Sequence, residues 1–370
     1  MQTVRIGVIG VGNIGGLHTR YLLNHEIDHA ELTCLCDINP DKTAPFKQAH
    51  PELHIYENYE TLLESGDADA VIIAVPHYLH PIMAMRAFGC GLHVIVEKPV
   101  GVYAKNVAEM NAAAEKSGKV FSSMFCVRTD PYFRTVRELV QSGALGGIKR
   151  VSWIATDWYR PQAYHDSSPW RSTWDGEGGG VLVNQSPHNL DMLQWIFGLP
   201  QRVTAIAQCG KYYRIEVEDE ATALLEYPTF TCTYTASTGE APGTNRLEIA
   251  GDMGRLVLEN RRIEFLRNEI SEREFNRRNT ENMPMPPYWT CTVPPRDGEM
   301  KHQHITQNFV NAILENEPLI APGVDGIREV ELSNAIHLSA WTGRTVTLPV
   351  DPDEFLRMLD EKRNASKKRK

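Results

Sequence analysis

The chain of 370 residues carries 38 lysines and arginines against 47 aspartates and glutamates, a formal net charge of −9. This balance argues against a general nucleic-acid binder, because such proteins present clustered positive charge to the phosphates. The length exceeds what one hydrophobic core usually supports, so we expect two domains. The longest apolar runs, such as residues 71–75, are far shorter than the roughly 20 residues that cross a bilayer, and we expect no membrane partner.

The N-terminus and the cysteines favour the cytoplasm. An apolar strand is expected within three residues of the N-terminus, which leaves no room for a secretory signal sequence. The seven cysteines lack the paired spacing of zinc or redox sites, and reduced thiols fit best. The pairs His77/His80 and His302/His304 have no matched carboxylate or thiol cluster, so no metal site is predicted. The basic tail 367–370 is typical of a solvated terminus and is given no function.

The first third of the chain predicts a doubly wound α/β domain. From Val4 to about Phe125, short β-branched runs alternate with amphipathic stretches, as parallel strands joined by crossover helices require. The expected strands are 4–9, 31–36, 70–75, 93–96 and 120–125. The expected helices include 18–23, 81–90 and 104–116.

Beyond Lys149 the pattern changes to successive strands without intervening helices, which indicates an antiparallel sheet. These strands are expected at 203–209, 221–227, 231–238, 247–250 and 263–266. A proline-rich connection then leads to expected helices at 304–315 and 326–342, which pack on this sheet or return to the first domain. We therefore divide the chain into a dinucleotide-binding domain (1–125), a substrate-binding and oligomerisation domain (126–350), and a terminal helix with the basic tail (351–370).

A glycine-rich turn follows the first expected strand, with the sequence Gly10-Val11-Gly12-Asn13-Ile14-Gly15. A lone G-x-G-x-x-G is a weak pattern, but here it stands between an apolar strand and a helical stretch. Gly10 permits the tight turn, Gly12 lets the backbone approach a pyrophosphate, and Gly15 lets helix and strand pack closely. The turn, with Asn13 and Ile14 at the start of the helix, predicts a dinucleotide site.

The second expected strand is followed by Asp37, 22 residues after Gly15. An acidic residue at this place binds the adenosine ribose hydroxyls and repels a 2′-phosphate, so Asp37 favours NAD over NADP. The alternative is an aspartate that caps a helix or stabilises a turn.

Two further clusters carry candidate chemistry. Glu97-Lys98-Pro99 follows the fourth expected strand, where open α/β sheets bind ligands, although an ordinary surface lysine paired with Glu97 is the alternative. In the second cluster Asn184, His188 and Asp191 share one face if the segment is helical, and a solvated polar face is the alternative. Histidine suits the oxidation of an alcohol, which needs a base with a pKa near neutral.

These motifs together resemble those of the Gfo/Idh/MocA oxidoreductases over nearly the whole chain. The resemblance rests on the glycine turn, on Glu97-Lys98-Pro99 and on the stretch 178–191, and it extends to 75–80, 169–171 and 303–313. It implies an N-terminal Rossmann domain that holds NAD and a C-terminal α+β domain with a large open antiparallel sheet. It also implies a homo-oligomer, a dimer or tetramer, formed through that sheet.

The resemblance implies roles for single residues as well. Lys98 matches the family lysine that contacts nicotinamide and the substrate hydroxyl, His188 the acid/base, and Asp191 a carboxylate that binds substrate. Relatives that resemble inositol dehydrogenases have aspartate where this chain has Asn184, which leaves Asn184 and Gln185 as neutral hydrogen-bonding groups. The resemblance implies further cofactor contacts from Pro76, His77, His80, Glu97, Trp170 and Arg171.

The segment 157–165 and the following 170–174 are rich in aromatic and hydrogen-bonding side chains, including Tyr159 and Tyr164. Aromatic faces cover the C–H face of a sugar ring while polar groups bind its hydroxyls, so this segment predicts a sugar platform. The alternative is aromatic packing between domains. Together with the family resemblance, this aromatic segment favours an enzyme that uses NAD to oxidise a ring hydroxyl, at C3, of a sugar, glycoside or cyclic polyol.

Two other functions fit the same residues. One is an NAD-dependent glycosidase that oxidises C3 transiently, eliminates the aglycone and reduces the product. The other is a non-catalytic sensor of NAD or sugar, against which the presence of both Lys98 and His188 counts.

Overall fold

The computed structural model describes residues 2–367 and divides into two compact units. The first unit holds the chain up to Thr129 together with Gly176–Gly178 and Met300–Val330, and the second holds the rest. The expected assignment of 126–350 to one domain therefore differs from the observed division, because residues 300–330 return to the first unit. The last three residues of the expected basic tail lie outside the described residues. Within residues 2–367, no helix is long and apolar enough to cross a membrane.

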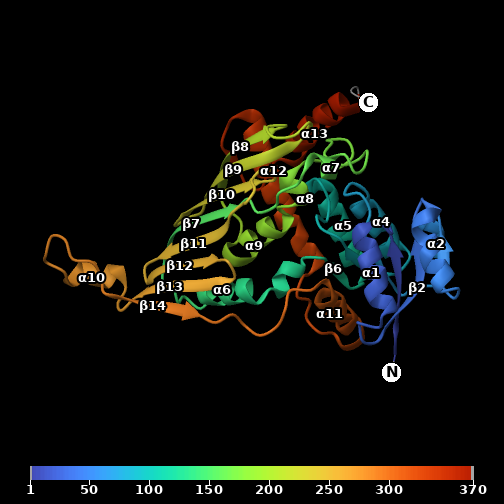
Figure 1. Cartoon of the computed structure of the whole chain (residues 1–370), viewed down its shortest axis with the longest axis horizontal. Coiled ribbons are helices and arrows are strands. Elements are labelled where there is room, and N and C mark those ends of the chain that lie inside the picture. The colour runs from blue at the N-terminus through green and yellow to red at the C-terminus, as the bar shows by residue number, and fades with distance from the viewer. Residues whose placement is uncertain (1, 368–370) are drawn as a thin grey trace. The chain divides into compact units, whose positions relative to one another are not determined.

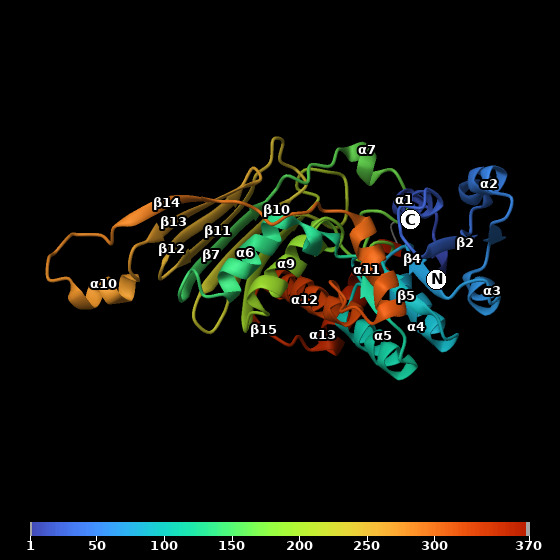
Figure 2. The same cartoon turned by 90° about the horizontal axis from the view of Figure 1, so that it is seen from below.

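The first unit contains a six-stranded sheet in the order β3-β2-β1-β4-β5-β6, with every neighbouring pair parallel. This confirms the predicted doubly wound α/β fold. Figure 2 shows α1 and α2 on one side of this sheet and α4 and α5 on the other. The strands are β1 (Val4–Ile9), β2 (Ala30–Cys36), β3 (His54–Tyr56), β4 (Ala70–Ile73), β5 (His93–Val96) and β6 (Phe121–Ser123). The helices are α1 (Asn13–Leu23), α2 (Pro40–Ala49), α3 (Tyr59–Glu64), α4 (Leu79–Gly89), α5 (Ala104–Ser117), η1 (Cys126–Thr129), α11 (His302–Glu315) and η2 (Gly323–Asp325).

The central strands of this sheet are apolar on both faces, since helices cover both. Every residue of β4 is buried, and so are all residues of β1 except Arg5. Near-continuous burial is typical of a parallel sheet and explains why these strands appear in the sequence as apolar runs rather than as alternating patterns.

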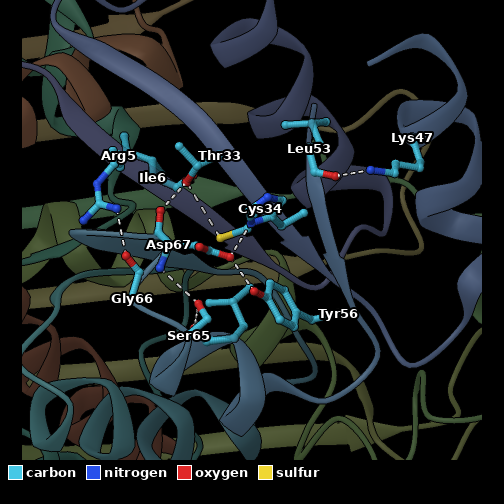
Figure 3. Close-up of polar contacts among 12 residues, drawn as sticks. Arg5, Ile6, Thr33, Cys34, Lys47, Leu53, Tyr56, Ser65, Gly66 and Asp67 are labelled. Carbon is cyan, nitrogen blue, oxygen red and sulfur yellow. Dashed lines mark hydrogen bonds and ion pairs between the residues drawn. The ribbon is translucent and has the colours of Figure 1, made fainter. Parts of the chain in front are cut away.

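The edge strand β3 was not predicted, because it has only three residues and its side chains are partly exposed. Side-chain contacts with the backbone and with acidic groups hold this edge (Figure 3). The Tyr56 hydroxyl donates to the carboxylate of Asp67, and Lys47 Nζ donates to the carbonyl oxygen of Leu53 at 2.7 Å. Contacts of this kind leave no periodic signal in the sequence.

The second unit contains a nine-stranded sheet in the order β14-β13-β12-β11-β7-β10-β9-β8-β15 (Figure 1). The pairing is antiparallel, as predicted, except that β7 and β10 run parallel. The strands are β7 (Ile148–Ala155), β8 (Arg202–Cys209), β9 (Glu218–Glu226), β10 (Thr231–Ser237), β11 (Asn245–Gly251), β12 (Gly254–Glu259), β13 (Arg262–Asn268), β14 (Tyr288–Val293) and β15 (Val346–Thr347).

The helices of this unit include α6 and α9, which lie along one side of the sheet (Figure 2). Outward side chains on several strands remain exposed, among them Ile206, whose side chain is 70% exposed, and Leu224, which is 40% exposed. The helices are α6 (Pro131–Gln141), α7 (Gln162–His165), α8 (Val181–Asn184), α9 (Pro187–Phe197), α10 (Glu272–Arg278) and α13 (Pro352–Lys367), while α12 (Gly326–Thr342) begins in the first unit and ends in the second.

Candidate functional site

The glycine turn joins β1 to α1, as predicted, and its three glycines differ in what surrounds them. A Cβ atom at Gly10 would lie 2.4 Å from the carbonyl oxygen of Ala74, and Gly10 has a φ of +88°. A Cβ at Gly15 would lie 1.8 Å from the carbonyl oxygen of Gly10, so helix and strand meet without room for a side chain. A Cβ at Gly12 would meet nothing within 4 Å. The space at Gly12 is therefore open to a ligand.

The N-terminus of α1 fits an anionic group. Gly12 is the N-cap residue and makes no side-chain capping hydrogen bond. The first N–H groups of a helix have no partner within the helix and carry partial positive charge. A pyrophosphate at this place would accept hydrogen bonds from them.

Asp37 follows β2 and contacts the glycine turn directly. Its Oδ2 accepts a hydrogen bond from the backbone N–H of Val11 at 2.7 Å, and its Oδ1 accepts from the N–H of Asn39 at 2.9 Å. The residue that caps α2 is Asn39, whose side chain accepts from the N–H of Asp41. Asp37 is thus not the helix cap considered as its alternative role. It stabilises a turn, and it connects the end of β2 to the turn after β1.

Lys98 follows β5, and its neighbour Glu97 is buried. Glu97 Oε1 lies 2.7 Å from His18 Nε2, and Glu97 Oε2 accepts from the backbone N–H of Lys98 at 3.1 Å. Burial alone would raise the pKa of Glu97, but the hydrogen bond and charge of His18, aided by His302 and Lys98, lower this pKa to about 2. Glu97 is therefore an ionised carboxylate inside the protein.

The Lys98 side chain is half-buried. Burial lowers the pKa of the Lys98 ammonium, while the nearby carboxylates of Glu97, Glu177 and Glu329 and the thiol of Cys126 oppose this effect. Lys98 is therefore partly buried, and its electrostatic interaction with Glu97 fits both the role in catalysis and the alternative of a lysine paired with Glu97.

The two histidines after β4 are buried and bind backbone carbonyls. His80 Nδ1 lies 2.7 Å from the carbonyl oxygen of Pro99, so its N–H donates to the segment that follows Lys98. Burial lowers the pKa of His80. His77 Nδ1 lies 3.1 Å from the carbonyl oxygen of Glu177. The predicted cofactor residues Pro76, His77 and His80 thus lie near the carboxyl end of β4, where His80 supports the backbone next to Lys98.

The parallel sheet brings the candidates of the first unit to one edge. The glycine turn, Asp37, Pro76 and Lys98 follow the carboxyl ends of β1, β2, β4 and β5. Strands β2 and β4 flank β1, so the order of the strands reverses at β1. Ligands of open α/β sheets bind at such a switch point.

The predicted helix from Asn184 onward is interrupted in the second unit. Asn184 ends α8, and α9 begins only at Pro187, which has no N–H to continue the helical hydrogen bonds. The prediction that Asn184, His188 and Asp191 share the face of one helix is therefore wrong. His188 and Asp191 do lie on α9, where His188 is half-buried and Asp191 is fully buried. Asp191 Oδ1 accepts from Gln194 Nε2 at 2.7 Å.

The aromatic segment of the second unit gathers three candidates around one hydroxyl. Tyr164 Oη accepts from Arg171 Nη1 at 2.7 Å and from Gln185 Nε2 at 3.2 Å. The Arg171 guanidinium lies 4.4 Å from the ring centroid of Tyr164 and 4.7 Å from that of Trp170. This packing lies within the second unit. Tyr159 is exposed.

Sequence reasoning missed several residues that support these candidates. His18 holds Glu97 across 79 positions of the chain. Glu218 Oε1 accepts from the backbone N–H groups of Gly180 and Leu182, at 2.8 and 3.1 Å, and so fixes the start of α8. His165 Nδ1 lies 2.7 Å from Ser172 Oγ, in a segment that had been assigned to substrate. Only His18 had a signal, its place three residues after the last glycine of the turn.

Comparison with known families matches both parts of the chain. The model described as the oxidoreductase family with an NAD-binding Rossmann fold matches residues 4–125, and the model of the GFO/IDH/MocA C-terminal domain matches residues 133–257. Together these two matches cover most of the chain, including the whole six-stranded sheet and strands β7 to β11 of the nine-stranded sheet.

Two curated proteins are similar over part of their length. The chain is 30% identical over 194 residues to 1-carboxy-3-chloro-3,4-dihydroxycyclohexa-1,5-diene dehydrogenase of Comamonas testosteroni, covering 52% of this chain and 47% of that protein. It is 26% identical over 205 residues to the scyllo-inositol 2-dehydrogenase (NADP(+)) IolW of Bacillus subtilis, covering 55% of each. The matches span about half the length of these relatives.

Among solved structures, the WlbA dehydrogenase from Bordetella pertussis is similar over nearly the whole chain. The identity is 25%, the TM-score is 0.79, and the match covers 95% of this chain and 100% of that one. The WlbA structure is a complex with NADH and UDP-GlcNAcA.

Proposed function

The chain belongs to the Gfo/Idh/MocA family of oxidoreductases, with an NAD-binding Rossmann domain, and we propose that it oxidises a ring hydroxyl of a sugar, glycoside or cyclic polyol to a ketone. The observation that carries this proposal is the setting of Lys98. It follows β5 at the edge of the sheet that also carries the glycine turn, and its neighbour Glu97 is ionised and anchored at both oxygens.

The residues of the first unit fit NAD. The open space at Gly12 and the first turn of α1 suit the pyrophosphate, and Asp37 stands where an acidic residue meets the adenosine ribose. The carboxylate of Asp37 would repel a 2′-phosphate, which favours NAD over NADP. When bound, NAD supplies the hydride acceptor that alcohol oxidation needs.

Removal of the hydroxyl proton and stabilisation of the developing alkoxide each have a candidate residue. The imidazole of His188 takes the proton of the substrate hydroxyl, and the Lys98 ammonium stabilises the alkoxide that develops. Asn184 cannot hold a proton, so His188 acts without a carboxylate at this place. Gln185, Tyr164 and Asp191 are assigned to substrate hydroxyls.

The relatives support a sugar or cyclic polyol as substrate. One curated relative is named for scyllo-inositol, and the WlbA structure holds a nucleotide sugar. The Tyr164–Arg171–Gln185 cluster combines an aromatic ring with hydrogen-bonding groups, which is the composition of sugar sites. C3 is proposed as the oxidised position from the family resemblance alone.

We also propose that the protein acts in the cytoplasm as a homo-oligomer. Seven free cysteines are described, four of them buried, which suits a reducing compartment. The exposed apolar side chains of Ile206 and Leu224 on the nine-stranded sheet offer a surface for a second copy. Light scattering of the purified protein tests the oligomer directly.

The test of the function is a spectrophotometric screen with NAD and with NADP, using inositols, free pyranoses, aryl glycosides and UDP-N-acetylglucosamine, with NMR of the products. Formation of NADH together with a keto product of an intact substrate is the expected result. Release of the aglycone without net NADH would instead assign the chain to the NAD-dependent glycosidases. Binding without turnover over the whole panel would make it a sensor.

A further inference from the structure

Behind Lys98 lies a chain of buried polar side chains that the proposed reaction does not use. His18, on α1, is fully buried, and its Nε2 lies 2.7 Å from Glu97 Oε1. Its Nδ1 contacts the hydroxyl of Tyr21, one turn later on the same helix. The Tyr21 hydroxyl in turn lies 2.7 Å from Thr306 Oγ1 of α11. All of these residues belong to the first unit.

The protonation of Glu97 sets the direction of its hydrogen bond with His18. A carboxyl group with a pKa of about 2 is ionised at neutral pH and can only accept hydrogen bonds. His18 Nε2 is therefore the donor. Burial raises the pKa of Tyr21, so this residue remains a phenol with its O–H available. Tyr21 and Thr306 thus fix the rotation of the His18 ring, and His18 fixes the carboxylate.

The second oxygen of Glu97 ties this chain to Lys98. Glu97 Oε2 accepts from the backbone N–H of Lys98 at 3.1 Å. With both oxygens engaged, the carboxylate has one orientation, and its charge lies at a fixed place relative to the lysine. Loss of the His18 contact would leave a buried, ionised carboxylate one donor short and free to turn.

We propose that His18 and Tyr21 are positioning residues that act through Glu97 to hold the Lys98 ammonium in the place and charge state needed for hydroxyl oxidation. This inference rests on the proposed function, in which Lys98 stabilises the alkoxide. His18 also lies three residues after Gly15, on the helix whose first turn receives the pyrophosphate. The same helix therefore serves the cofactor with its first turn and the lysine with its second.

Several charged groups face Lys98. Among those that favour its protonated form, Glu97 has the largest effect. The others are the carboxylates of Glu177 and Glu329 and the thiol of Cys126, while His80 and His302 also lie within electrostatic range. If Glu97 turns away, the pKa of Lys98 falls further. Because oxidation requires the ammonium, kcat falls as the pH rises through this pKa. A displaced Glu97 would therefore move this loss of kcat to lower pH.

Two variants and one matched control test the positioning role. Tyr21→Phe removes one hydroxyl without changing the ring, and His18→Gln alters the donor to Glu97. The control is Tyr56→Phe, the same substitution at the edge strand β3, where the hydroxyl contacts Asp67 (Figure 3). The probe is the sugar or inositol of the panel that the wild-type chain oxidises fastest, at saturating NAD.

We expect kcat to fall about 10- to 100-fold in His18→Gln, since small displacements of a catalytic group have effects of this size. A smaller fall is expected in Tyr21→Phe. The KM for the sugar and the Kd for NAD should change less than about threefold, and the basic limb of the kcat profile should move to lower pH. Tyr56→Phe should match wild type in kcat, in the KM for the sugar, in the Kd for NAD and in the pH of the basic limb.

A double-mutant cycle separates positioning from a general structural effect. If His18 acts through Glu97, adding His18→Gln to Glu97→Gln should change kcat by less than about threefold, so the effects are not additive. Additive effects, or folded variants with the kcat and pH profile of wild type, would overturn the inference. If His18→Gln does not fold, the isosteric Tyr21→Phe decides. Full turnover by Lys98→Met would instead overturn the proposed function.

Discussion

The carboxylate of Asp37 is hydrogen-bonded to the backbone N–H of Val11, with a distance of 2.7 Å between Asp37 Oδ2 and the Val11 nitrogen. The end of β2 is thereby fixed to the glycine turn between β1 and α1. Asp37, which we propose selects between the two dinucleotides, thus also stabilises the loop proposed to bind their phosphates. Substitution of Asp37 should therefore affect both the choice of cofactor and the affinity for it.

Asp37→Ser removes the negative charge and the contact with Val11. We expect weaker binding of NAD, and a ratio of NAD to NADP affinities that falls by about 10-fold or more, because removing a repulsive charge is worth on the order of 1–2 kcal/mol. Calorimetric Kd values for both dinucleotides measure this ratio. Asp41→Ser, a nearby acidic residue in the first turn of α2, is the control and should leave the ratio unchanged. A wild-type preference for NADP would contradict the role given to Asp37.

The two later glycines of the turn should respond differently to alanine. In Gly15→Ala the new Cβ would lie 1.8 Å from the Gly10 carbonyl oxygen, so the helix must shift and the Tm should fall by several degrees. In Gly12→Ala the Cβ meets nothing within 4 Å, so the Tm should stay near wild type while NAD binds more weakly. Thermal unfolding and NAD titration of both variants decide this. Equal Tm losses would show that Gly12 is also required for packing.

Lys98→Met and His188→Ala should each lower kcat by about 10²- to 10⁴-fold, the range typical of lost acid/base and electrostatic catalysis. Both variants should fold, and both should retain NAD binding, because the glycine turn and Asp37 are unchanged. Single-turnover absorbance at 340 nm with the best substrate of the panel measures the loss. A variant that retains full turnover would remove its residue from the mechanism.

The stability of the first unit should fall in mild acid because of His93. Burial, followed by the charge of Lys119, lowers the pKa of His93 from 6.5 to about 4, and His93 Nδ1 accepts from the N–H of Val120 at 2.9 Å. Between pH 4 and pH 6.5 the unfolded chain therefore binds more protons than the folded chain. The contribution of neutral His93 to the free energy of unfolding is complete above pH 6.5 and is lost as the pH falls toward 4. Urea unfolding at pH 7 and pH 5 measures how the free energy of unfolding changes with pH. This change should be smaller in His93→Gln, whereas an unchanged pH dependence would exclude His93 as its source.

Much of the parallel sheet could be predicted from the sequence, because buried strands such as β1 and β5 appear as short apolar runs between turn signals. The boundaries of both strands agree with the prediction. The three-residue β3 could not be found, since its partly exposed side chains show no pattern of burial. The parallel pair β7 and β10 also had no local signal, because residues 81 positions apart are brought together by tertiary packing.

The candidate site was predictable where its residues stand in contiguous motifs. The glycine turn and Glu97-Lys98-Pro99 each occupy a few consecutive positions, and parallel strands bring such positions to one edge. Contacts between distant positions were not predictable, as with His18 and Glu97 or Glu218 and Gly180. The assumed helix through Asn184 and His188 failed because the break before Pro187 outweighs the apparent spacing of polar residues.

Transfer of deuterium from substrate to cofactor tests the proposed oxidation most directly. The best substrate of the panel, deuterated at the carbon that becomes the ketone, is incubated with NAD and the wild-type chain, and the dinucleotide is analysed by mass spectrometry. We expect one deuterium in the NADH formed, with Lys98→Met giving little labelled product in the same time. Unlabelled NADH, or a keto product formed with the deuterium released to water, would contradict it.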